Sequence, residues 1–563
     1  MKTVRIGGGS AFFIDSAMAV PQLLGAGVDY ILLDYLAEGA MGLVGRARLA
    51  DAQAGFPSDF MDVHIGPFLH QIAAMGVRIV SNAGGVNPEG LARKLRARIA
   101  ELGLSIKVSA VTGDDLMSRL PDLADTRDMF TGAPFPLQGI TSCNAYLGAF
   151  PIAGALKGGA QIVITGRVVD SALALGPLIH EFGWTPTEYD KLAGGTVAGH
   201  LIECGPQVTG GTFTDWRQVE GWATIGAPIA ECHADGSCVI TKPEGTGGLV
   251  SLGTVAEQLL YEVSDPQAYF VPDVTCDMAT LSIADLGDNR VRVTGAKGYP
   301  PPATLKACVT WDDGWRGIAY QPVIGPDARI RAQRQADALF ERGSLMLRGR
   351  NMADWRRTEA VLIGSDEEIV VKLVVEHDDM LAAQMFLREQ FAAISAMSPG
   401  TSVAFGPQVA PMMNLLCFTV ARDMAVPMVD GTPTPDTTPA TFDAALLERP
   451  AAPVTTQTPS RTATLEELAW ARSGEKGETI NIGVIARKAE DLPALRAALT
   501  QERLHAWLPD LGAFRVTVYD LPGINALNLV MVGALPGGLN ASQRLDPAAK
   551  SIAQRLMRFP VAL

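Results

Sequence analysis

The sequence predicts an α/β protein with a mostly parallel sheet in its N-terminal part, a mixed α/β second lobe and a small C-terminal α+β domain. Short runs rich in β-branched residues alternate with amphipathic helical stretches through the first 170 residues, which is the pattern of stacked βα units. From residue 206 to 425 the strand-like runs are shorter and are separated by Gly and Pro turns. After residue 462, strand-like runs and helical stretches share one compact segment.

The elements of the two N-terminal lobes follow from hydrophobic periodicity. The stretch 89–102 is the clearest helix, because Leu91, Leu95 and Ile99 recur at helical spacing while basic residues occupy a solvated face. In the second lobe, residues 206–425, strands are expected at 237–241, 290–294, 368–376 and 415–420, and helices near 328–345 and 378–397. In the first lobe, residues 1–205, strands are expected at 3–7, 28–34, 77–82, 106–112 and 161–165.

A linker and a small domain complete the chain. Residues 426–462 contain seven prolines and many threonines, which predicts an extended linker because proline stiffens the backbone and cannot complete a strand ladder. Residues 463–563 form the last domain, for which the pattern predicts a ferredoxin-like plan. Its expected strands are 465–471, 479–486, 514–521 and 527–532, and its expected helices lie near 492–500 and 546–557.

Composition restricts the class of partner. The chain of 563 residues carries 46 basic and 60 acidic side chains, a net charge of −14, which argues against nucleic acid or an anionic membrane as the main partner. Hydrophobic residues make up 48% of the chain, which predicts a homo-oligomer. The seven cysteines include no CxxC pair, so reduced thiols in a cytoplasmic protein are expected. No signal peptide or membrane span is expected either.

Small and polar residues follow all five strands expected in the first lobe. Because the carboxyl ends of parallel strands share one edge of a sheet, these residues predict a ligand site there. At any single position an Asp or Asn is also a common helix N-cap or turn former. In chain order the residues are Gly8, Gly9, Ser10, Asp34, Asn82, Gly84, Gly85, Asp114 and Arg167.

The glycine run at residues 7–9 has two interpretations. Its backbone amides, with those of the glycines at 84 and 85, can approach a carboxylate or phosphate, or the run is a tight strand-to-helix turn. The segment does not match GxGxxG, and no acidic residue stands at the ribose position, so a nicotinamide cofactor is not expected. No GxxxxGK[ST] phosphate loop is present. We expect an activity that needs no cofactor.

The segment 193–205 contains the densest group of reactive side chains. On a helix His200 and Glu203 lie one turn apart, with Cys204 beside them. Such side chains can act as general acids and bases. A histidine with an ordinary structural partner at a helix end is the alternative. A metal pair is a weaker interpretation, because the second His and the Cys spacing of metal sites are missing, and no bound metal is expected.

Two further groups could bind an anion. Asn144, Arg167 and Asp170 surround the fifth expected strand, and the guanidinium could meet a carboxylate or phosphate or form a structural Arg–Asp clamp. Lys242 enters a Gly-rich loop together with Thr246 and Gly247, which predicts an anion site or an ordinary turn.

Several segments carry a family resemblance. They are RIGGGSAF, DYILLDYLAE, RIVSNAGGVNPEG, VTGDDL, NAYLGAFPIAGAL, IVITGRVVDSAL, AGHLIECGPQVTGG and ITKPEGTGGLVS, and, near the C-terminus, LEELAWARSGEKGETINIG and LPGINALNLVMVG. With them the chain resembles the acyclic terpene utilisation AtuA family, in which a long AtuA domain precedes a small ferredoxin-fold domain. The small domain of the family usually has aspartates where this chain has Glu475 and Glu478. The resemblance implies pathways that activate branched terpenoid acids as coenzyme A thioesters and then carboxylate, hydrate and cleave them.

Together these observations predict an enzyme that acts on a branched or unsaturated acyl-CoA, or on its carboxylic acid, by proton transfer. The reaction would be a hydration, dehydration, isomerisation or hydrolysis, so the enzyme would be a lyase or a hydrolase. Asp34, Asp114 and His200 with Glu203 are the candidate acids and bases. The loop glycines, Arg167 and Lys242 are candidates for binding the anionic group.

Two alternatives remain open from the sequence. The chain could be a non-catalytic subunit that organises an acyl-CoA carboxylase or hydratase, with the C-terminal domain as a docking module. It could also be a metal-dependent hydrolase. The sequence does not decide whether the loop 471–479 reaches the N-terminal site or only an interface.

Overall fold

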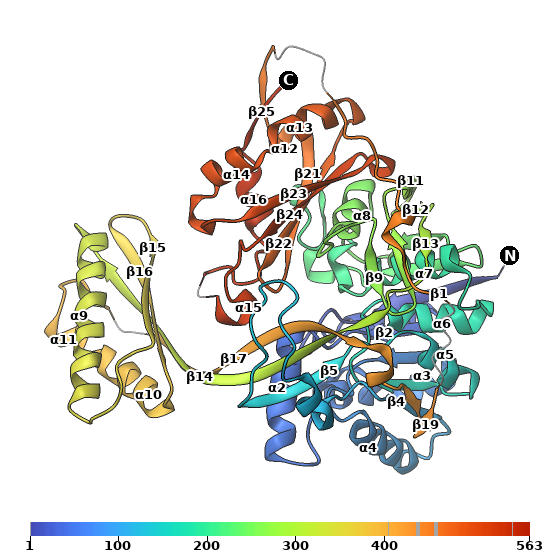
Figure 1. The fold of residues 1–563 in the computed structure, drawn as a ribbon, viewed down its shortest axis with the longest axis horizontal. Helices are drawn as coiled ribbons and strands as arrows, with labels where there is room; N and C mark the ends of the chain where they lie inside the picture. The colour runs from blue at the N-terminus through green and yellow to red at the C-terminus, as the bar shows by residue number, and fades with distance from the viewer. Residues whose placement is uncertain (1, 403–404, 435–439, 455–459, 543) are drawn as a thin grey trace.

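The computed structural model describes residues 2–402, 405–434, 440–454, 460–542 and 544–563 (Figure 1). Within this part of the chain the largest sheet has the strand order β11-β12-β8-β7-β1-β2-β3-β6-β4-β18-β19. Its centre is parallel, which confirms the α/β fold class. The parallel strands are β1 (Thr3–Gly8), β2 (Tyr30–Leu33), β3 (Arg78–Ser81), β6 (Ile162–Thr165) and β4 (Val108–Thr112).

Helices cover both faces of this sheet, as alternation of side chains along the strands requires. In β2, Tyr30 and Leu32 belong to one buried core, whereas Ile31 and Leu33 belong to the core on the opposite face. The first core includes α5 (Phe150–Lys157), α6 (Ala172–Phe182) and α7 (Tyr189–Ile202), and the second includes α1 (Ala19–Gly25), α3 (Leu69–Met75) and α4 (Pro88–Glu101).

Helix α4 forms for the reasons that its sequence indicates. The side chain of Asn87 accepts a hydrogen bond from the Gly90 amide and caps the first turn, and Pro88 follows at a position where no amide is needed. Leu91, Leu95 and Ile99 are fully buried or nearly so.

The sheet continues with antiparallel strands that the sequence analysis assigned to a second lobe. Strand β7 pairs with β1 from Thr3↔His233 to Gly7↔Ile229, so the sheet crosses the expected boundary at residue 205/206. The pairing joins segments more than two hundred residues apart in the chain, and local periodicity contains no signal for such a contact. The added strands are β7 (Ile229–His233), β8 (Cys238–Thr241), β12 (Arg290–Thr294) and β11 (Ser282–Gly287).

A long β-ribbon carries a separate lobe away from the main body (Figure 1). Strand β14 (Thr304–Ile324) pairs with β17 (Phe405–Ala421) along most of its length, and near its start it also pairs with β5 (Ile140–Ala145). We call the outer part, residues 315–411, the projecting lobe. Its further elements are α9 (Ala328–Arg348), β15 (Arg357–Gly364), β16 (Glu368–His377), α10 (Met380–Glu389) and α11 (Ala393–Ala396).

Parts of the proline-rich segment contact the main body. Strand β18 (Met428–Val429) pairs with β4, and β19 (Thr432–Pro433) pairs with β18. Arg449 forms a bidentate ion pair with Asp265, with N–O distances of 2.7 and 2.6 Å. Residues 435–439 and 455–459 of the expected linker lie outside the described residues. These parts of the segment are therefore attached to the main body.

The C-terminal domain has its own hydrophobic core and an antiparallel sheet in the order β21-β22-β24-β23. Its first expected strand begins later than predicted, because Leu465–Leu468 form a helical turn, α12, closed by a capping box between Thr464 and Glu467. The strands are β21 (Ala469–Lys476), β22 (Thr479–Ala486), β24 (Ala526–Val532) and β23 (Arg515–Leu521), and the longer helices are α13 (Leu492–Ala498), α14 (Gln501–Trp507) and α16 (Ile552–Leu556).

This domain packs on helix α8 (Leu252–Leu259) and the chain that follows it. The side chain of Asn528 donates to the carbonyl of Val263, and that of Asn481 donates to the carbonyl of Leu260. Both asparagines are buried. Among the described residues, no helix has the length and apolar character needed to cross a membrane.

Candidate active site at the domain junction

The carboxyl end of strand β2 is followed by a buried aspartate. Asn82 donates from Nδ2 to Oδ1 of Asp34 at 2.6 Å, and its own Oδ1 accepts from the Tyr35 amide at 2.7 Å. The Ser10 hydroxyl donates to the Asp34 carbonyl at 3.0 Å. Burial and the charge of Asp170 raise the pKa of Asp34 well above its usual range, against the opposing charge of Arg167. Three residues expected at this edge therefore lie together.

Asp114 joins the ends of three strands. Its Oδ2 accepts from Asn144 Nδ2 and from the Arg167 amide, both at 2.8 Å. Burial raises its pKa to about 6. The residue lines a small cavity of about 180 Å³ together with Asn87 and Asp115. Asp114 thus connects the ends of these strands through its hydrogen bonds.

The guanidinium of Arg167 is buried and forms the Arg–Asp clamp that the sequence left open. Its Nη1 donates to Asp170 at 2.5 Å, and its Cζ atom lies 4.1 Å from the centre of the Tyr146 ring. Tyr146 in turn donates its hydroxyl hydrogen to Glu38 at 2.6 Å. Among the described residues, the Nε atom of Arg167 has no hydrogen-bond partner.

Glu38 and Lys306 form an ion pair that sequence reasoning missed. Lys306 Nζ lies 3.0 Å from Glu38 Oε1 and 4.7 Å from the centre of the Tyr146 ring. Burial raises the pKa of Glu38, but the charges of Lys306, Lys476 and Arg167 outweigh this effect and hold it well below its usual range. Glu38 and Tyr146 lie in the segments DYILLDYLAE and NAYLGAFPIAGAL, so the family resemblance was a usable signal for them.

His200 and Glu203 have the geometry that their spacing predicts. The Nδ1 atom of His200 lies 3.1 Å from Oε1 of Glu203, and both side chains are buried. Burial lowers the pKa of His200, but the hydrogen bond and charge of Glu203 raise it above its usual value. Within the described part of the chain, His200 Nε2 and Glu203 Oε2 have no hydrogen-bond partner. Glu203 therefore orients Nδ1 of the imidazole, and Nε2 is buried without a hydrogen-bond partner among the described residues.

The C-terminal domain contributes charge to the same region. Lys476, at the end of β21, donates to Glu262 at 2.8 Å, and Lys550 donates to the same carboxylate at 3.0 Å. Burial and the charge of Glu262 raise the pKa of Glu475 to about 8. The charge of Lys476 acts on groups of the N-terminal domain, Glu38 among them. The loop 471–479 therefore extends its influence to the N-terminal site.

We define the junction cluster as the charged groups from both domains that act on one another here. Its more exposed members retain 17 to 30% of their side-chain surface, so the cluster is partly accessible to solvent. Those members are Glu38, Asp170, Lys306 and Lys476, and the buried members are Asp34, Arg167, His200 and Glu203.

The glycine loop fits the tight-turn interpretation. The Gly8 amide donates to the Pro228 carbonyl at 2.9 Å, and the Gly9 amide donates to the Leu32 carbonyl at 2.8 Å. A Cβ at Gly8 would clash with the Ile202 carbonyl oxygen. The Gly85 amide donates to the Asn82 carbonyl at 3.2 Å. These three amides already have partners, so they are poor candidates for anion binding.

The Lys242 loop is held by contacts of its own. Lys242 donates to the Thr246 carbonyl at 2.7 Å, and the Thr246 hydroxyl donates to the Pro243 carbonyl at 2.6 Å. The Gly247 amide donates to the Thr224 carbonyl at 2.9 Å. These contacts correspond to the ordinary turn that was the alternative interpretation.

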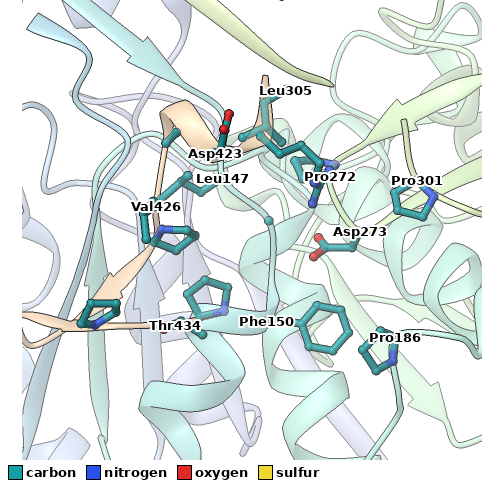
Figure 2. A pocket seen from close by; sticks show the side chains of 16 residues that line it. Leu147, Phe150, Pro186, Pro272, Asp273, Pro301, Leu305, Asp423, Val426 and Thr434 are labelled. Carbon is teal, nitrogen blue, oxygen red and sulfur yellow. The ribbon is translucent and has the colours of Figure 1, made fainter. Parts of the chain in front are cut away.

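Figure 2 shows an apolar cavity of about 660 Å³. It lies beside the start of strand β14, on the face of the strand opposite to Lys306. Leu305 lines it, whereas the next residue, Lys306, reaches Glu38, because neighbouring side chains of a strand point to opposite faces. Leu147, Phe150 and Pro272 also line the cavity. No motif in the sequence marked this cavity, which is formed by segments distant in the chain.

Within the described residues, no three His, Cys, Asp or Glu side chains are arranged to hold a metal ion.

Comparison with known families identifies both parts of the chain. The family model described as acyclic terpene utilisation family protein AtuA matches residues 4–429. The chain belongs to the AtuA family. A second model, the AtuA ferredoxin-like domain, matches residues 463–562 and so contains Glu475 and Lys476. The junction cluster thus combines residues from both regions of this AtuA family member. A comparison with curated proteins finds no match.

Proposed function

We propose that this AtuA family member is an enzyme that transfers protons on a branched or unsaturated acyl-CoA, or on its carboxylic acid, in acyclic terpene catabolism. One observation carries the proposal: Glu203 holds Nδ1 of His200, while Nε2 has no partner among the described residues. An imidazole oriented by a carboxylate is a common general base and acid. The other members of the junction cluster supply the charges that such a reaction needs.

Four groups of the cluster act on the substrate in this proposal. Nε2 of His200 removes a proton next to the thioester carbonyl or activates a water molecule. Lys306 and Lys476 stabilise the negative charge that develops on the carbonyl oxygen, or pair with a substrate carboxylate. Asp34, with its raised pKa, can hold a proton and return it. The acid and base groups all belong to the chain, so the proposed reaction needs no cofactor.

Substrate would approach by way of the more exposed members of the cluster. Asp170 and Lys476 are 25% and 30% exposed, whereas His200 lies deeper and is almost completely buried. A buried base is shielded from bulk water, which limits side reactions of a reactive intermediate.

The test is exchange and turnover with a panel of branched and unsaturated acyl-CoA thioesters and their free acids. The full-length protein is incubated with each compound in D₂O, and mass spectrometry detects deuterium in the substrate, added or lost water, or released coenzyme A. His200→Asn should abolish the change. His180→Asn is the matched control, because His180 lies on α6 against Glu181, outside the junction cluster. No conversion of any compound, or equal conversion by His200→Asn, would refute the proposal.

A second candidate is a non-catalytic subunit that assembles with itself and with an acyl-CoA carboxylase or hydratase. It is favoured by the exposed apolar side chains of the projecting lobe, which are Ile330, Leu345, Leu381, Phe391 and Ile394. Native mass spectrometry of the purified chain, alone and with such enzymes, distinguishes the two functions. A complex that survives dilution, formed by a chain that retains no thioester, would support the second candidate.

A further inference from the structure

Two cysteines face each other at the base of the projecting lobe. Cys308 on β14 and Cys417 on β17 are directly opposite in the antiparallel ladder, and their Sγ atoms lie 3.0 Å apart. All seven cysteines are free thiols in this structure. Both members of the pair are buried.

The backbone around the pair gives it the geometry of a cross-strand disulfide. The Cys417 amide donates outward to Asp128 Oδ2 at 2.9 Å, and the Cys417 carbonyl accepts from the Met129 amide at 2.8 Å. Cys308 and Cys417 are therefore a non-hydrogen-bonded pair, in which Cα atoms lie about 4.5 Å apart. That separation is inside the range of about 4.4–6.8 Å that a disulfide spans.

We propose that Cys308 and Cys417 are a redox site that a peroxide oxidises reversibly to a disulfide. The Cys308 thiolate attacks one oxygen of hydrogen peroxide, which gives a sulfenic acid and releases hydroxide. The Cys417 sulfur then attacks the Cys308 sulfur, the S–O bond breaks, and water leaves. In sum, two thiols and one peroxide molecule give one disulfide and two water molecules. An external dithiol reverses the reaction.

The surroundings favour Cys308 as the attacking sulfur. Burial raises the pKa of the Cys308 thiol, but the hydrogen bond from Cys417 and the charge of Lys306 lower it below its usual value. The pKa of Cys417 is raised, chiefly because its S–H donates to Cys308 and because it is buried. The Tyr146 hydroxyl also lies 3.4 Å from Cys308 Sγ. Hydrogen peroxide is a small molecule, and Cys308 and Cys417 keep 6% and 4% of their surface exposed.

The chain contains a matched pair that lacks these surroundings. Cys232 and Cys238 are also opposite each other, in the β7–β8 hairpin. Burial and the neighbouring Cys238 raise the pKa of Cys232, and burial raises that of Cys238 to about 12. The position of the cysteines in a ladder is therefore similar, but the tendency to form a thiolate differs.

Oxidation would affect two parts of the molecule. The disulfide would join strands β14 and β17 where they leave the body, across 109 residues of sequence that include the projecting lobe. It would also change the sulfur next to Tyr146, whose hydroxyl binds Glu38 in the junction cluster. The inference itself does not depend on the proposed reaction.

The test uses the full-length wild-type protein. After treatment with hydrogen peroxide, the free thiols are alkylated in denaturant and counted by intact mass, and peptides are mapped without reduction. We expect five alkylated thiols in place of seven, a peptide link between Cys308 and Cys417, and recovery of all seven thiols after dithiothreitol. Seven alkylated thiols, irreversible oxidation without a link, or a Cys232–Cys238 link instead would overturn the proposal.

Variants separate the roles of the two sulfurs. Cys417→Ser should trap a sulfenic acid on Cys308, detected as a dimedone adduct, whereas Cys308→Ser should give no adduct on Cys417. Cys232→Ser, the matched control, should form the disulfide at the wild-type rate. Lys306→Met should slow oxidation several-fold, because it removes the charge that favours the thiolate. An adduct on Cys417 in the Cys308→Ser variant would contradict the assignment of the attacking sulfur.

Discussion

His200, in the last turn of helix α7, and Glu203, the residue that caps the end of this helix, are in contact through Nδ1 and Oε1 at 3.1 Å, and both are buried. Helix α7 also packs closely against its neighbours: a Cβ at Gly199 would meet the Ser171 carbonyl at 2.6 Å. Gln258 adds a hydrogen bond from its side chain to the His200 carbonyl at 3.2 Å. The imidazole is therefore oriented by its neighbour and by the backbone that carries it.

Glu203→Gln should separate the orienting role of Glu203 from catalysis itself. Loss of the carboxylate removes the main interaction that raises the pKa of His200, so this pKa should fall. Because the neutral imidazole is the base, the acidic limb of the pH–rate profile should move to lower pH. The maximal rate should fall by about ten- to a hundredfold, since the imidazole is less well oriented.

The measurement is the pH dependence of deuterium exchange into an acyl-CoA substrate for wild type and Glu203→Gln. Glu188→Gln, at a surface position before the same helix, is the control and should match wild type. An unchanged pH profile in Glu203→Gln would show that this carboxylate does not set the protonation of His200.

Asp114→Asn should remove a pH dependence of stability. Burial raises the pKa of Asp114 to about 6, above the value of 3.8 of an ordinary aspartate. The native state thus binds this proton more tightly than the unfolded state does. Its contribution to the free energy of unfolding is complete below pH 3.8 and is lost as the pH rises through about 6. Asparagine has no such proton, so the variant should lack this loss, which amounts to about 3 kcal/mol.

Urea unfolding at several pH values between about 4 and 7 tests this prediction. The curve of wild-type stability should fall through this range more steeply than that of Asp114→Asn. Asp122→Asn changes an exposed aspartate and should keep the wild-type slope. Parallel curves for wild type and Asp114→Asn would exclude the linkage.

The sequence predicted the parts of the site that depend on local spacing and on parallel strands. Asp34 and Asn82 follow strands that are adjacent and parallel, so their meeting follows from the fold class alone. The His200–Glu203 contact follows from helical periodicity. Whether these residues act on a substrate remains a prediction.

The two lysines of the junction cluster could not be predicted in the same way. Lys306 reaches Glu38 from strand β14, and Lys476 reaches Glu262 from another domain. Both contacts cross more than two hundred residues of sequence, and a lone lysine in a strand has no distinctive local pattern. The Gly-rich composition of the Lys242 loop indicated an anion site or an ordinary turn, and composition alone does not separate the two; in the structure the lysine donates to the Thr246 carbonyl of its own loop.

Glu475→Gln should change the pH dependence of catalysis, whereas Glu257→Gln should leave it unchanged. Burial raises the pKa of both carboxyl groups to about 8. In each case the stability due to the protonated form is present at low pH and is lost as the pH rises through about 8, so both variants should flatten the stability curve. Only Glu475 lies beside Lys476 and Glu262, whereas Glu257 accepts from the Thr214 amide.

Thermal unfolding and deuterium exchange between about pH 6 and 9 measure the two effects together. Exchange by the wild type should change as Glu475 ionises and adds a negative charge near the cluster. Glu475→Gln should remove that change, and Glu257→Gln should retain it. If both variants retain it, Glu475 has no electrostatic influence on the reaction.

Asp215→Ala should weaken the attachment of the C-terminal domain. Asp215 accepts two hydrogen bonds from Arg487, each at 2.6 Å, and one from Trp470 Nε1 at 2.8 Å. Arg487 and Trp470 belong to the C-terminal domain, and the Asp215 side chain is only 15% exposed. Removing the carboxylate leaves a charged donor and an indole N–H without their partner, which costs about 2–3 kcal/mol.

The matched control is Asp510→Ala, which removes a carboxylate that binds Arg544 and Arg555 within the C-terminal domain itself. That carboxylate is 45% exposed, so its loss should cost no more than about 1 kcal/mol. In differential scanning calorimetry Asp215→Ala should divide unfolding into two transitions, whereas Asp510→Ala should only lower the Tm slightly. Because Lys476 comes from the loosened domain, Asp215→Ala should also reduce substrate conversion. A single wild-type transition in Asp215→Ala would mean that the apolar contacts and buried asparagines alone hold the domains together.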